Sequence, residues 1–560
     1  MELEKVADRI LETDVLVLGG GLAGSMAAVQ ARRQGARTVL MEKSAVRRSG
    51  DAGGGQDHMP NIAHPKFNDL SPEEFAANRH IGLEGLVDPA LTLQLARYAF
   101  AVVKECERLG VKLKEEDGYY RMQEGRIKGK KDFMLYRGAD LKLKLEAAVR
   151  GSGTVMLERT MFTSLLTLDG RVVGATGVGT RTGEFVVVKA RAVVLASGGA
   201  HRLYWHPHGG FPSNLFMLYQ DPQNCGDGTA VAYRAGAKLC NMEFVYGHTN
   251  AVGLPRAFTL TWYPVQNSKG ERIMDKHSSY IAKMPSDPPY ARTAAVFHER
   301  GELLTWDPTQ MPDDKERFWD FMMSNERPYS IKMAQILGGV NHAPREARTW
   351  FSGVPRGISG VRVTGIHGET SLPGLFAAGD VMGGHIMSGA TGALVWGYLA
   401  GEEAARSFAS HPEPVVDTAR VQAERERVLS PLGRKDGIWP LELENTVRKV
   451  VTDYVGFEKL QAKLEKCVQM LEGIQEGYVP ALAARDPHEL MRALELQDIL
   501  TVGHLHAQAA LLRTESRLVP WHFRMDYPEQ DDEHWRRSIL LWKENGQMHH
   551  EMTPIWNQTA

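Results

Sequence analysis

Short continuous runs of apolar residues, each ending in glycine or an acid, recur along the chain. The first run, Val15 to Leu18, leads into three glycines, and the second, in RTVLMEK, ends at Glu42. Later runs occur in ARAVVLASGGA (190–200) and SLPGLFAAGD (371–380). Continuous apolar residues are typical of parallel strands that are buried on both faces. The pattern therefore predicts a parallel sheet whose strands end in glycine-rich or acidic turns.

Other segments carry their apolar residues at helical spacing. Small residues dominate a predicted helix from Leu22 to Gln34 and a second one in SGATGALVWGYLAGEEAAR, which starts at Ser388. From 421 to 512, apolar residues recur every three or four positions, which predicts ordinary helix packing. Strands that alternate with helices, followed by a helical region, predict an α/β fold.

Length and composition narrow the class of protein. A chain of 560 residues is too long for one simple core. The formal net charge of −2 gives no electrostatic reason to expect nucleic acid as a partner, and no apolar run is long enough to cross a bilayer. The N-terminal sequence MELEKVADRI lacks the apolar core of a secretory signal, so we expect a cytoplasmic protein with no direct membrane span.

The residue types that bind metals are scattered. The chain has four widely separated cysteines: Cys106, Cys225, Cys240 and Cys467. No two have the Cys-x-x-Cys spacing of iron–sulfur and structural zinc sites. His206 and His208 flank Pro207 in an aromatic stretch (201–220), which we interpret either as a packed loop or as the wall of a ligand site. We expect no metal site, and any cluster that exchanges electrons with this chain would belong to another polypeptide.

The glycines after the first strand have the spacing of a dinucleotide-binding turn. Gly19, Gly21 and Gly24 form G-x-G-x-x-G. The first allows the turn, the second lets the backbone approach a pyrophosphate, and the third lets the helix pack on its strand. The N-terminus of that helix offers N–H groups to the phosphates, and Glu42 is placed to accept hydrogen bonds from both ribose hydroxyls. We expect FAD or NAD rather than NADP, the alternative being a glycine-rich turn of another α/β fold.

Later segments decide between the two dinucleotides. PGLFAAGD with its small-residue helix, CGDGTAVAYRAGAKLCNMEF (225–244) and LLRTESRLVPWHFRMDYPEQDDEHW (511–535) resemble the flavoprotein superfamily of fumarate reductases, succinate dehydrogenases, aspartate oxidases and adenylylsulfate reductase α-subunits. Leu518 stands where this family has glycine. The resemblance implies that the dinucleotide is FAD, that Asp380 holds its ribityl chain and that Asp227 contacts it. The helix after Asp380 would point its N-terminus at the flavin pyrimidine ring, where it would stabilise the anionic reduced flavin.

The resemblance also implies the domain organisation. A Rossmann-like FAD-binding domain would cover residues 1–243 and 352–415, and an inserted α+β capping domain would cover residues 244–351. A helical domain (416–512) and a C-terminal arm (513–560) would complete the chain. We interpret the arm either as an inter-subunit contact or as ordinary packing, and we expect an oligomer.

The motifs place cofactor-binding residues throughout the predicted FAD domain. They are Gly19, Gly21, Leu22, Ala23 and Gly24; Glu42 and Lys43; Ser49, Gly50, Gly54 and Gly55; Ser197, Gly198 and Gly199; Asp227; and Gly379, Asp380, Ser388, Ala393 and Leu394. Respiratory members of the resembled family tether FAD through a histidine in an R-S-H-T sequence, whereas this chain has Gly50 there. Because glycine cannot form that bond, we expect FAD to be bound noncovalently.

The substrate site is expected over the flavin, under the cap. MEFVYGHT aligns with the family's substrate-binding sequence, which implies a catalytic role for His248 and substrate binding by Thr249. YARTAAVFHE places Arg292 where fumarate reductases keep an arginine proton donor. The remaining candidates for substrate binding are His58, Asn61, Trp262, Arg348 and His385.

The chain departs from fumarate reductases at two places. Arg256 and Thr259 stand where the family has the acid and the arginine of its proton relay, and the family's carboxylate-clamp arginine has no counterpart in GGHIMSGATGAL. The sequence R-S-G (48–50) and the GGHIMSGATG stretch are more similar to adenylylsulfate reductase α-subunits. We therefore do not expect fumarate itself as the substrate.

These features favour an FAD-dependent reductase or dehydrogenase. It would be a flavoprotein subunit that acts on an anionic small molecule by hydride transfer at flavin N5 and exchanges electrons with a separate iron–sulfur, ferredoxin-like protein. The alternatives are adenylylsulfate reductase proper, a self-contained oxidase that uses oxygen as aspartate oxidases do, and a flavin-containing binding subunit without turnover.

Overall fold

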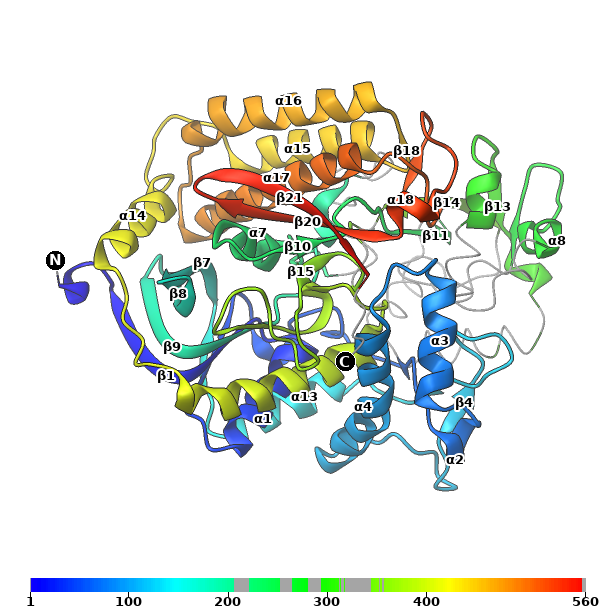
Figure 1. The fold of residues 1–560 in the computed structure, drawn as a ribbon, viewed down its shortest axis with the longest axis horizontal. Helices are drawn as coiled ribbons and strands as arrows, with labels where there is room; N and C mark the ends of the chain where they lie inside the picture. The colour runs from blue at the N-terminus through cyan, green and yellow to red at the C-terminus, as the bar shows by residue number, and fades with distance from the viewer. Residues whose placement is uncertain are drawn as a thin grey trace.

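A seven-stranded sheet lies at the centre of the molecule (Figure 1). The computed structural model describes residues 2–205, 221–251, 264–279, 294–311, 313, 317, 344–351, 353–354 and 357–555. The strand order is β6-β2-β1-β9-β8-β7, and β16 pairs with β9. The strands are β1 (Arg9–Leu18), β2 (Thr38–Glu42), β6 (Val155–Glu158), β7 (Thr160–Leu168), β8 (Arg171–Gly179), β9 (Phe185–Leu195) and β16 (Leu375–Ala377).

The parallel part of this sheet confirms the prediction from the apolar runs. Strands β6, β2, β1, β9 and β16 are all parallel to their neighbours. The sequence analysis did not predict the antiparallel strands β7 and β8, which extend the sheet beyond β9. Asp169 and Gly170 connect them with φ values of 49° and 75°, as a tight hairpin turn between twisted strands requires.

Two helices of small residues pack together beneath the sheet (Figure 1). They are α1 (Leu22–Arg33) and α13 (Gly389–Ser407), and both confirm helices predicted from the sequence. Added to Gly401, a Cβ atom would overlap the Ala27 carbonyl oxygen and lie 2.6 Å from Ala27 Cα. Gly397 faces the Ala23 backbone in the same way. Glycine at these two positions therefore lets the helix backbones touch.

The predicted helical region is also confirmed. It forms α14 (Thr418–Leu429), α15 (Pro440–Val455), α16 (Gln461–Gly477) and α17 (Pro487–Leu512). Figure 1 shows α15, α16 and α17 stacked along the side of the molecule opposite to α1 and α13. Their apolar faces meet at Leu464, Cys467 and Leu471, which are buried.

The C-terminal arm packs against the rest of the chain in the part that the structure describes. Its strands β20 (Arg537–Glu544) and β21 (Gln547–Pro554) extend a second sheet with the order β17-β15-β10-β20-β21. The partners are β10 (Leu239–Cys240), β15 (Gly360–Arg362) and β17 (Met382–Gly383). Leu518, where the resembled family has glycine, has a left-handed φ of 49°. This conformation explains the family's glycine, because only glycine adopts it without cost.

Smaller elements surround the central sheet. A four-stranded sheet within the predicted cap has the order β11-β14-β13-β12, and a three-stranded sheet has the order β3-β5-β4. Their strands are β11 (Gly247–Ala251), β12 (Val265–Gln266), β13 (Leu304–Trp306), β14 (Arg345–Phe351), β3 (His58–Met59), β4 (Arg121–Gln123) and β5 (Phe133–Leu135). The helices are α2 (Pro65–Asn68), α3 (Pro72–Gly82), α4 (Pro89–Arg108), α5 (Leu141–Gly151), α7 (Asp227–Arg234), α8 (Ile273–Lys276) and α18 (Asp532–Trp535), and β18 (Glu458–Lys459) pairs with β19 (Phe523–Arg524).

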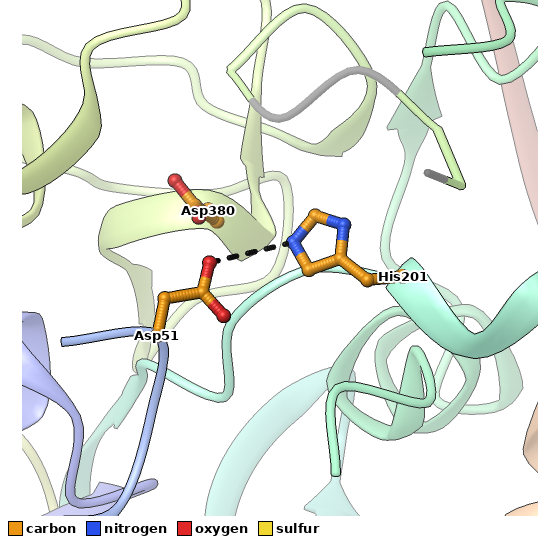
Figure 2. A group of neighbouring side chains, drawn as sticks. All are labelled: Asp51, His201 and Asp380. Carbon is orange, nitrogen blue, oxygen red and sulfur yellow. Dashed lines mark ion pairs between the residues drawn. The ribbon is translucent and has the colours of Figure 1, made fainter. Parts of the chain in front are cut away.

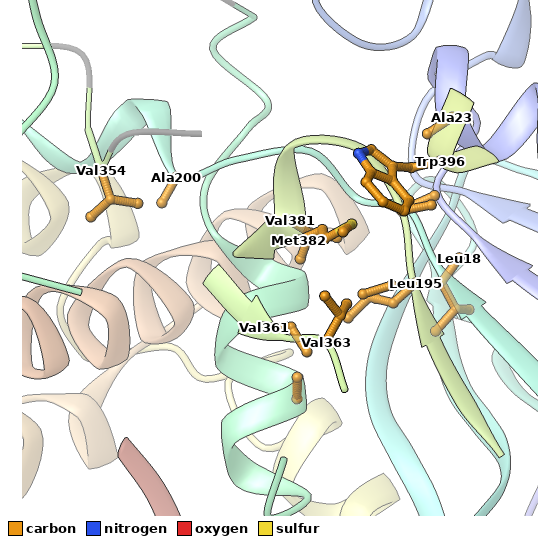
Figure 3. Close-up of a cluster of buried hydrophobic side chains, with 14 of the residues drawn as sticks. Leu18, Ala23, Leu195, Ala200, Val354, Val361, Val363, Val381, Met382 and Trp396 are labelled. Carbon is orange, nitrogen blue, oxygen red and sulfur yellow. The ribbon is translucent and has the colours of Figure 1, made fainter. Parts of the chain in front are cut away.

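The main hydrophobic core joins the central sheet to α13. Leu18 and Leu195, at the ends of adjacent strands, are fully buried, as are Val381, Met382 and Trp396 (Figure 3). Removing a large buried side chain of this kind costs about 2–5 kcal/mol, so the core fixes α13 on the strand ends.

Substitution of Gly401 by alanine tests the contact between α1 and α13. We expect Gly401→Ala to lower the stability of the apo-protein by about 1–3 kcal/mol, because the added methyl group must push the helices apart. The shift in melting temperature by circular dichroism measures the effect. The control is Gly473→Ala in α16, where a Cβ atom meets nothing within 4 Å. This change removes an exposed helical glycine and is expected to stabilise by up to about 1 kcal/mol. Equal melting temperatures for both variants would contradict the close contact.

Candidate functional site

A cavity lies at the carboxyl ends of β1, β2, β9 and β16. This is the position where open parallel sheets bind their ligands. Many of the residues predicted to bind the cofactor line it: Gly19, Gly21, Leu22, Ala23, Glu42, Lys43, Gly50, Ser197, Gly198, Asp227, Gly379, Asp380 and Ala393. His58, predicted to bind substrate, lines it as well. The structure therefore brings segments that are far apart in the sequence to one site.

Some of the predicted site residues are not part of the cavity wall. Gly24, Ser49, Gly54, Gly55, Gly199, Ser388 and Leu394 do not line the cavity, nor do the substrate candidates Asn61 and His385. A Cβ atom on Gly24 would overlap the Gly19 carbonyl, so this glycine serves helix–strand packing, as predicted. Asn61 donates its side-chain N–H to the Ser388 carbonyl at 3.1 Å and so fixes the loop that precedes α13.

The structure corrects the expected position of His385. Its side chain is only 1% exposed and its ring lies 5.5 Å from that of Trp396, in the core. Burial lowers the pKa of His385 to about 3, so the imidazole is neutral at physiological pH. The prediction of a substrate role for His385 rested on the resemblance of GGHIMSGATG to adenylylsulfate reductase α-subunits.

The glycine turn has the geometry of a pyrophosphate cradle. Gly19 has a φ of 104°, and a Cβ atom there would lie 2.5 Å from the Ala196 carbonyl oxygen. In contrast, a Cβ atom on Gly21 meets only Gly50 Cα, at 3.9 Å, so it would project into the cavity. The backbone at Gly21 can therefore approach a ligand closely, and the N-terminus of α1 begins directly after it.

A buried lysine supports this turn from behind. Lys142 donates to the Gly20 carbonyl oxygen at 2.5 Å and to Ser25 Oγ at 3.1 Å. Its side chain is fully buried, and burial lowers its pKa to about 8. The sequence analysis missed Lys142, because a single lysine in an amphipathic helix carries no signal of its role.

Glu42 is oriented as an acceptor at the end of β2. Its two carboxylate oxygens accept from the backbone N–H groups of Gly20 and Ser44, each at 2.7 Å. These bonds fix the carboxylate at the cavity wall, where the remaining lone pairs fit ribose hydroxyl groups.

Unsatisfied polar atoms in the cavity wall provide a test of the fit to FAD. Ser197 Oγ and Asp227 Oδ1 are buried and have no hydrogen-bond partner among the residues that the structure describes. Both residues line the cavity. A buried polar group without a partner is costly, and the hydroxyl groups of a dinucleotide would supply partners here. The residues present therefore fit FAD.

Lys43 and Asp227 belong to a buried ion network. Lys43 Nζ lies 2.9 Å from Asp227 Oδ2 and 3.0 Å from Glu495 Oε1 of α17. Arg202 contacts Glu495 at 2.8 Å and Glu444 of α15 at 2.9 Å. The helical region is thus ionically connected to the cavity wall.

Asp51, His201 and Asp380 form a further cluster, shown in Figure 2. Within the described residues, their ligand atoms lie within 4.8 Å of one another, and His201 Nε2 lies 3.9 Å from Asp51 Oδ2. This set of groups is able to bind a metal ion. However, Asp51 and Asp380 both line the cavity, and their oxygens also suit the hydroxyl groups of a ribityl chain, so we interpret the cluster as part of the cofactor site.

The N-terminus of α13 forms one end of the cavity. Gly389, Ala390 and Ala393 line it, and the first turn has no acidic side chain. A bound group there meets the positive end of the helix dipole, which stabilises negative charge. The predicted orientation of this helix toward the flavin is consistent with this position.

Further residues line the cavity that the sequence analysis did not single out as site residues. They include Gln56, Arg126, Phe162, Asp221 and Asn224. None stands at a strand end with a glycine or acidic motif, and the site residues were predicted from such motifs. Arg126 lies in the segment that connects β4 and β5, and it adds a cation to the wall.

The predicted substrate residues of the cap are only partly described. Arg292 and Trp262 lie outside the described residues, as do Arg256, Thr259 and the 206–220 loop. The backbones of His248 and Thr249 lie in β11 and that of Arg348 in β14. These strands pair antiparallel, with Asn250 opposite Arg348, so the backbone brings the two segments together. The substrate roles of these residues stay predictions.

Two known families match this chain over most of its length. An FAD binding domain family matches residues 14–393, and the fumarate reductase flavoprotein C-terminal family matches residues 444–559. The cavity and the first match define an FAD-binding oxidoreductase. The chain belongs to the fumarate reductase and succinate dehydrogenase flavoprotein superfamily, and it is an FAD-dependent enzyme of the reductase and dehydrogenase type.

Curated relatives cover nearly the whole chain. It is 27% identical to a component of the fumarate reductase (CoM/CoB) of Methanothermobacter marburgensis, over 95% of this chain and 97% of the relative. It is 26% identical to L-aspartate oxidase of Streptomyces coelicolor, over 95% of this chain and 91% of the relative. The solved adenylylsulfate reductase of Archaeoglobus fulgidus has the same fold, with a TM-score of 0.88 and 21% identity over 100% of this chain and 98% of that one. Among the described helices, none is long and apolar enough to cross a membrane.

A methyl group at position 21 tests the pyrophosphate cradle. We expect Gly21→Ala to weaken FAD binding by about tenfold or more, because the added atom points into the cavity rather than into the protein. Titration of the apo-protein with FAD by calorimetry measures the affinity. Gly151→Ala, at the end of α5 with nothing within 4 Å of its Cβ atom, is the control and should bind normally. Normal binding by Gly21→Ala would show that the pyrophosphate lies elsewhere.

Proposed function

We propose that this chain is the flavoprotein subunit of a two-protein reductase or dehydrogenase that acts on an anionic small molecule. The observation that carries the proposal is the arrangement of one continuous cavity. It joins the cradle for FAD to a wall that contains His58 and Arg126, beside the N-terminus of α13. When bound, FAD supplies hydride transfer at N5. Arg126 and the N-terminus of α13 would supply positive potential at that end of the cavity, which suits an anionic substrate.

The substrate roles extend this proposal to residues of the cap. Arg292 would hold the substrate anion and pass it a proton, with His248 as a second catalytic group and Thr249, Trp262 and Arg348 as contacts. These assignments come from the aligned motifs. The pairing of β11 with β14 supports them, since it brings the backbones of 248–249 and 348 to adjacent strands.

The electron partner is proposed to be a separate iron–sulfur, ferredoxin-like protein. The chain has four cysteines, and all are buried free thiols at separate positions. Burial raises the pKa of the Cys106 and Cys467 thiols, which opposes the thiolate form that binds a cluster. Two relatives are named as subunits, which also supports a multi-protein enzyme.

A self-contained oxidase is the second candidate, because L-aspartate oxidase is a relative over nearly the full chain. Adenylylsulfate reductase proper is a third candidate, supported by the R-S-G sequence, while the structural likeness concerns the fold. Reoxidation of the reduced enzyme by different substrates and by air distinguishes the three candidate functions.

The flavin is proposed to be bound without a covalent link. Gly50 lines the cavity with a φ of 76°, and a Cβ atom there would lie 3.1 Å from Gly21 Cα. A histidine at this position would be strained and would press on the dinucleotide turn. The backbone geometry thus disfavours the tethered arrangement.

Acid precipitation tests the noncovalent link. We expect the whole flavin of the purified enzyme to appear in the supernatant after the protein is precipitated, with FAD identified by its absorbance and by chromatography. Flavin that stays in the washed pellet would show a covalent link to another residue.

Reoxidation of the reduced enzyme tests the function, with each substrate added under anaerobic conditions and with air supplied separately. We expect the reduced enzyme to be reoxidised by one member of a panel of anionic enoates, disulfides and adenylylsulfate, and only slowly by air. Arg292→Ala should keep FAD and lose the substrate-dependent reaction, by about a hundredfold or more. Arg300→Ala, which removes an exposed partner of Glu458, is the matched control and should react normally.

Each contrary result has a distinct meaning. Rapid reoxidation in air with peroxide formation would favour the oxidase. Near-normal activity of Arg292→Ala would exclude the proton-donor role, whereas failure of every substrate and of added reduced ferredoxin would refute the reductase.

A further inference from the structure

His58 lies at the end of the cavity that the N-terminus of α13 forms. His58 and Pro60 line the cavity together with Gly389, and a Cβ atom on Gly389 would lie 3.3 Å from Pro60 Cγ. The Asn61 side chain donates to the Ser388 carbonyl oxygen at 3.1 Å. The segment 58–61 is therefore held against the first turn of α13, at the end of the cavity where that helix stabilises negative charge.

The His58 ring is held in one orientation by a buried carboxylate. Its Nδ1 lies 2.5 Å from Asp57 Oδ1, and Asp57 is 0% exposed. The ring stacks on Phe133 with 4.5 Å between centroids and 16° between planes. Strand pairing fixes the backbone, since Tyr136 N donates to the Asp57 carbonyl and His58 lies opposite Leu135. A carboxylate in this position favours the imidazolium form.

Other charges around His58 oppose that form. Arg126, from the segment between β4 and β5, lines the same cavity, and the α13 dipole directs its positive end there. Burial raises the pKa of Asp132, next to Phe133, to about 6, so this group is only partly ionised near neutral pH. His385, which precedes α13, is neutral because burial lowers its pKa to about 3. Lys43 also lines the cavity, whereas the carboxylates of Glu42, Asp51, Asp221, Asp227 and Asp380 in its wall act in the opposite direction and favour the imidazolium.

These opposing influences make His58 sensitive to a new negative charge in the cavity. We propose that the Asp57–His58 pair takes up one proton from solvent when the bound FAD is reduced and returns it when the FAD is oxidised. The inference rests on the proposed function only in requiring FAD in this cavity, and it needs neither the substrate nor the electron partner.

The electrons and protons balance as follows. Reduction of FAD by two electrons, from the partner or from a chemical reductant, adds one proton at N5 and leaves one negative charge on the isoalloxazine. The second proton binds the His58 ring, and the imidazolium neutralises that charge. On oxidation, a hydride leaves to the substrate and the His58 proton becomes available for the product.

The pH dependence of the flavin midpoint potential tests this proposal without any turnover. In the wild-type holoenzyme, titrated with dithionite between about pH 5 and 9, two protons should accompany two electrons over part of the range. Over the part of the range in which the reduced flavin stays anionic, the slope of potential against pH should be about twice that of His58→Gln, in which only the N5 proton is taken up. Asp57→Asn should move the steep part of the curve to lower pH, because the imidazolium loses its carboxylate.

His64→Gln is the matched control. His64 lies on the same segment and its ring contacts those of Phe67 and Phe100, with centroids 4.5 Å away, but it does not line the cavity. The slope of potential against pH for His64→Gln should equal that of the wild type. Equal slopes for wild type and His58→Gln would overturn the proposal. If His58→Gln fails to bind FAD, a wild-type slope of one proton per two electrons throughout the range would overturn it equally.

Failure of the proton-uptake proposal can be distinguished from failure of the proposed function. The potential titration uses a chemical reductant, so its result does not depend on the substrate panel or on ferredoxin. Suppose that the wild-type slope has a steep part but that the enzyme accepts no substrate of the panel. The proposed proton uptake would then stand, and only the proposed reductase function would be refuted.

Discussion

The contact between the backbones of α1 and α13 is the constraint on which the site depends. Each helix begins at the carboxyl edge of the sheet, so each points its N-terminal N–H groups into the same cavity. Gly397 and Gly401 have no side chains, which allows the two helices to lie closer than ordinary helix packing permits. We propose that one helix end binds the pyrophosphate and that the other faces the redox ring. Their separation is fixed by the contacts of Gly397 with Ala23 and of Gly401 with Ala27, which span about one helical turn.

A second constraint connects the helical region to the cavity. Burial alone would raise the pKa of Glu495, but the charges of Arg202 and Lys43 outweigh that effect and hold its pKa well below the usual range. A fully paired buried network contributes little net stability compared with apolar packing, yet removal of one member leaves a charge unpaired at a cost of several kcal/mol. The network therefore acts mainly to fix geometry. Through this network, Glu444 of α15 and Glu495 of α17 hold Lys43 and Asp227 at the cavity wall. The two helices lie on the side of the molecule opposite to α1 and α13.

The sequence predicted the parts of the site that depend on the backbone. The roles of Gly19, Gly21 and Gly24 follow from strict rules of approach and packing. In the structure Gly19 makes the turn, Gly24 packs on the strand and the Gly21 backbone faces the cavity. Side chains such as Lys142 and Arg126 were missed, because their positions depend on how distant segments meet. The substrate role predicted for His385 rested on a motif alone, whereas in the fold its ring packs against that of Trp396 in the helix that follows. The antiparallel strands β7 and β8 escaped prediction although the Asp169–Gly170 turn signals a hairpin.

This difference between backbone and side-chain determinants suggests how the two ends of the cavity are specified. The dinucleotide end consists of glycines, helix N-termini and one carboxylate fixed by backbone N–H groups, so few substitutions are compatible with it. The redox end is built by side chains from separate loops, namely Gln56, His58 and Arg126 around the start of α13. Such side chains are replaceable without disturbing the sheet. Relatives with the same fold and different named activities are the expected result, since the fold holds the cofactor while the loops choose the chemistry. In this chain the loops place an imidazole paired with a buried carboxylate beside a helix N-terminus, an arrangement suited to couple electron transfer to proton uptake.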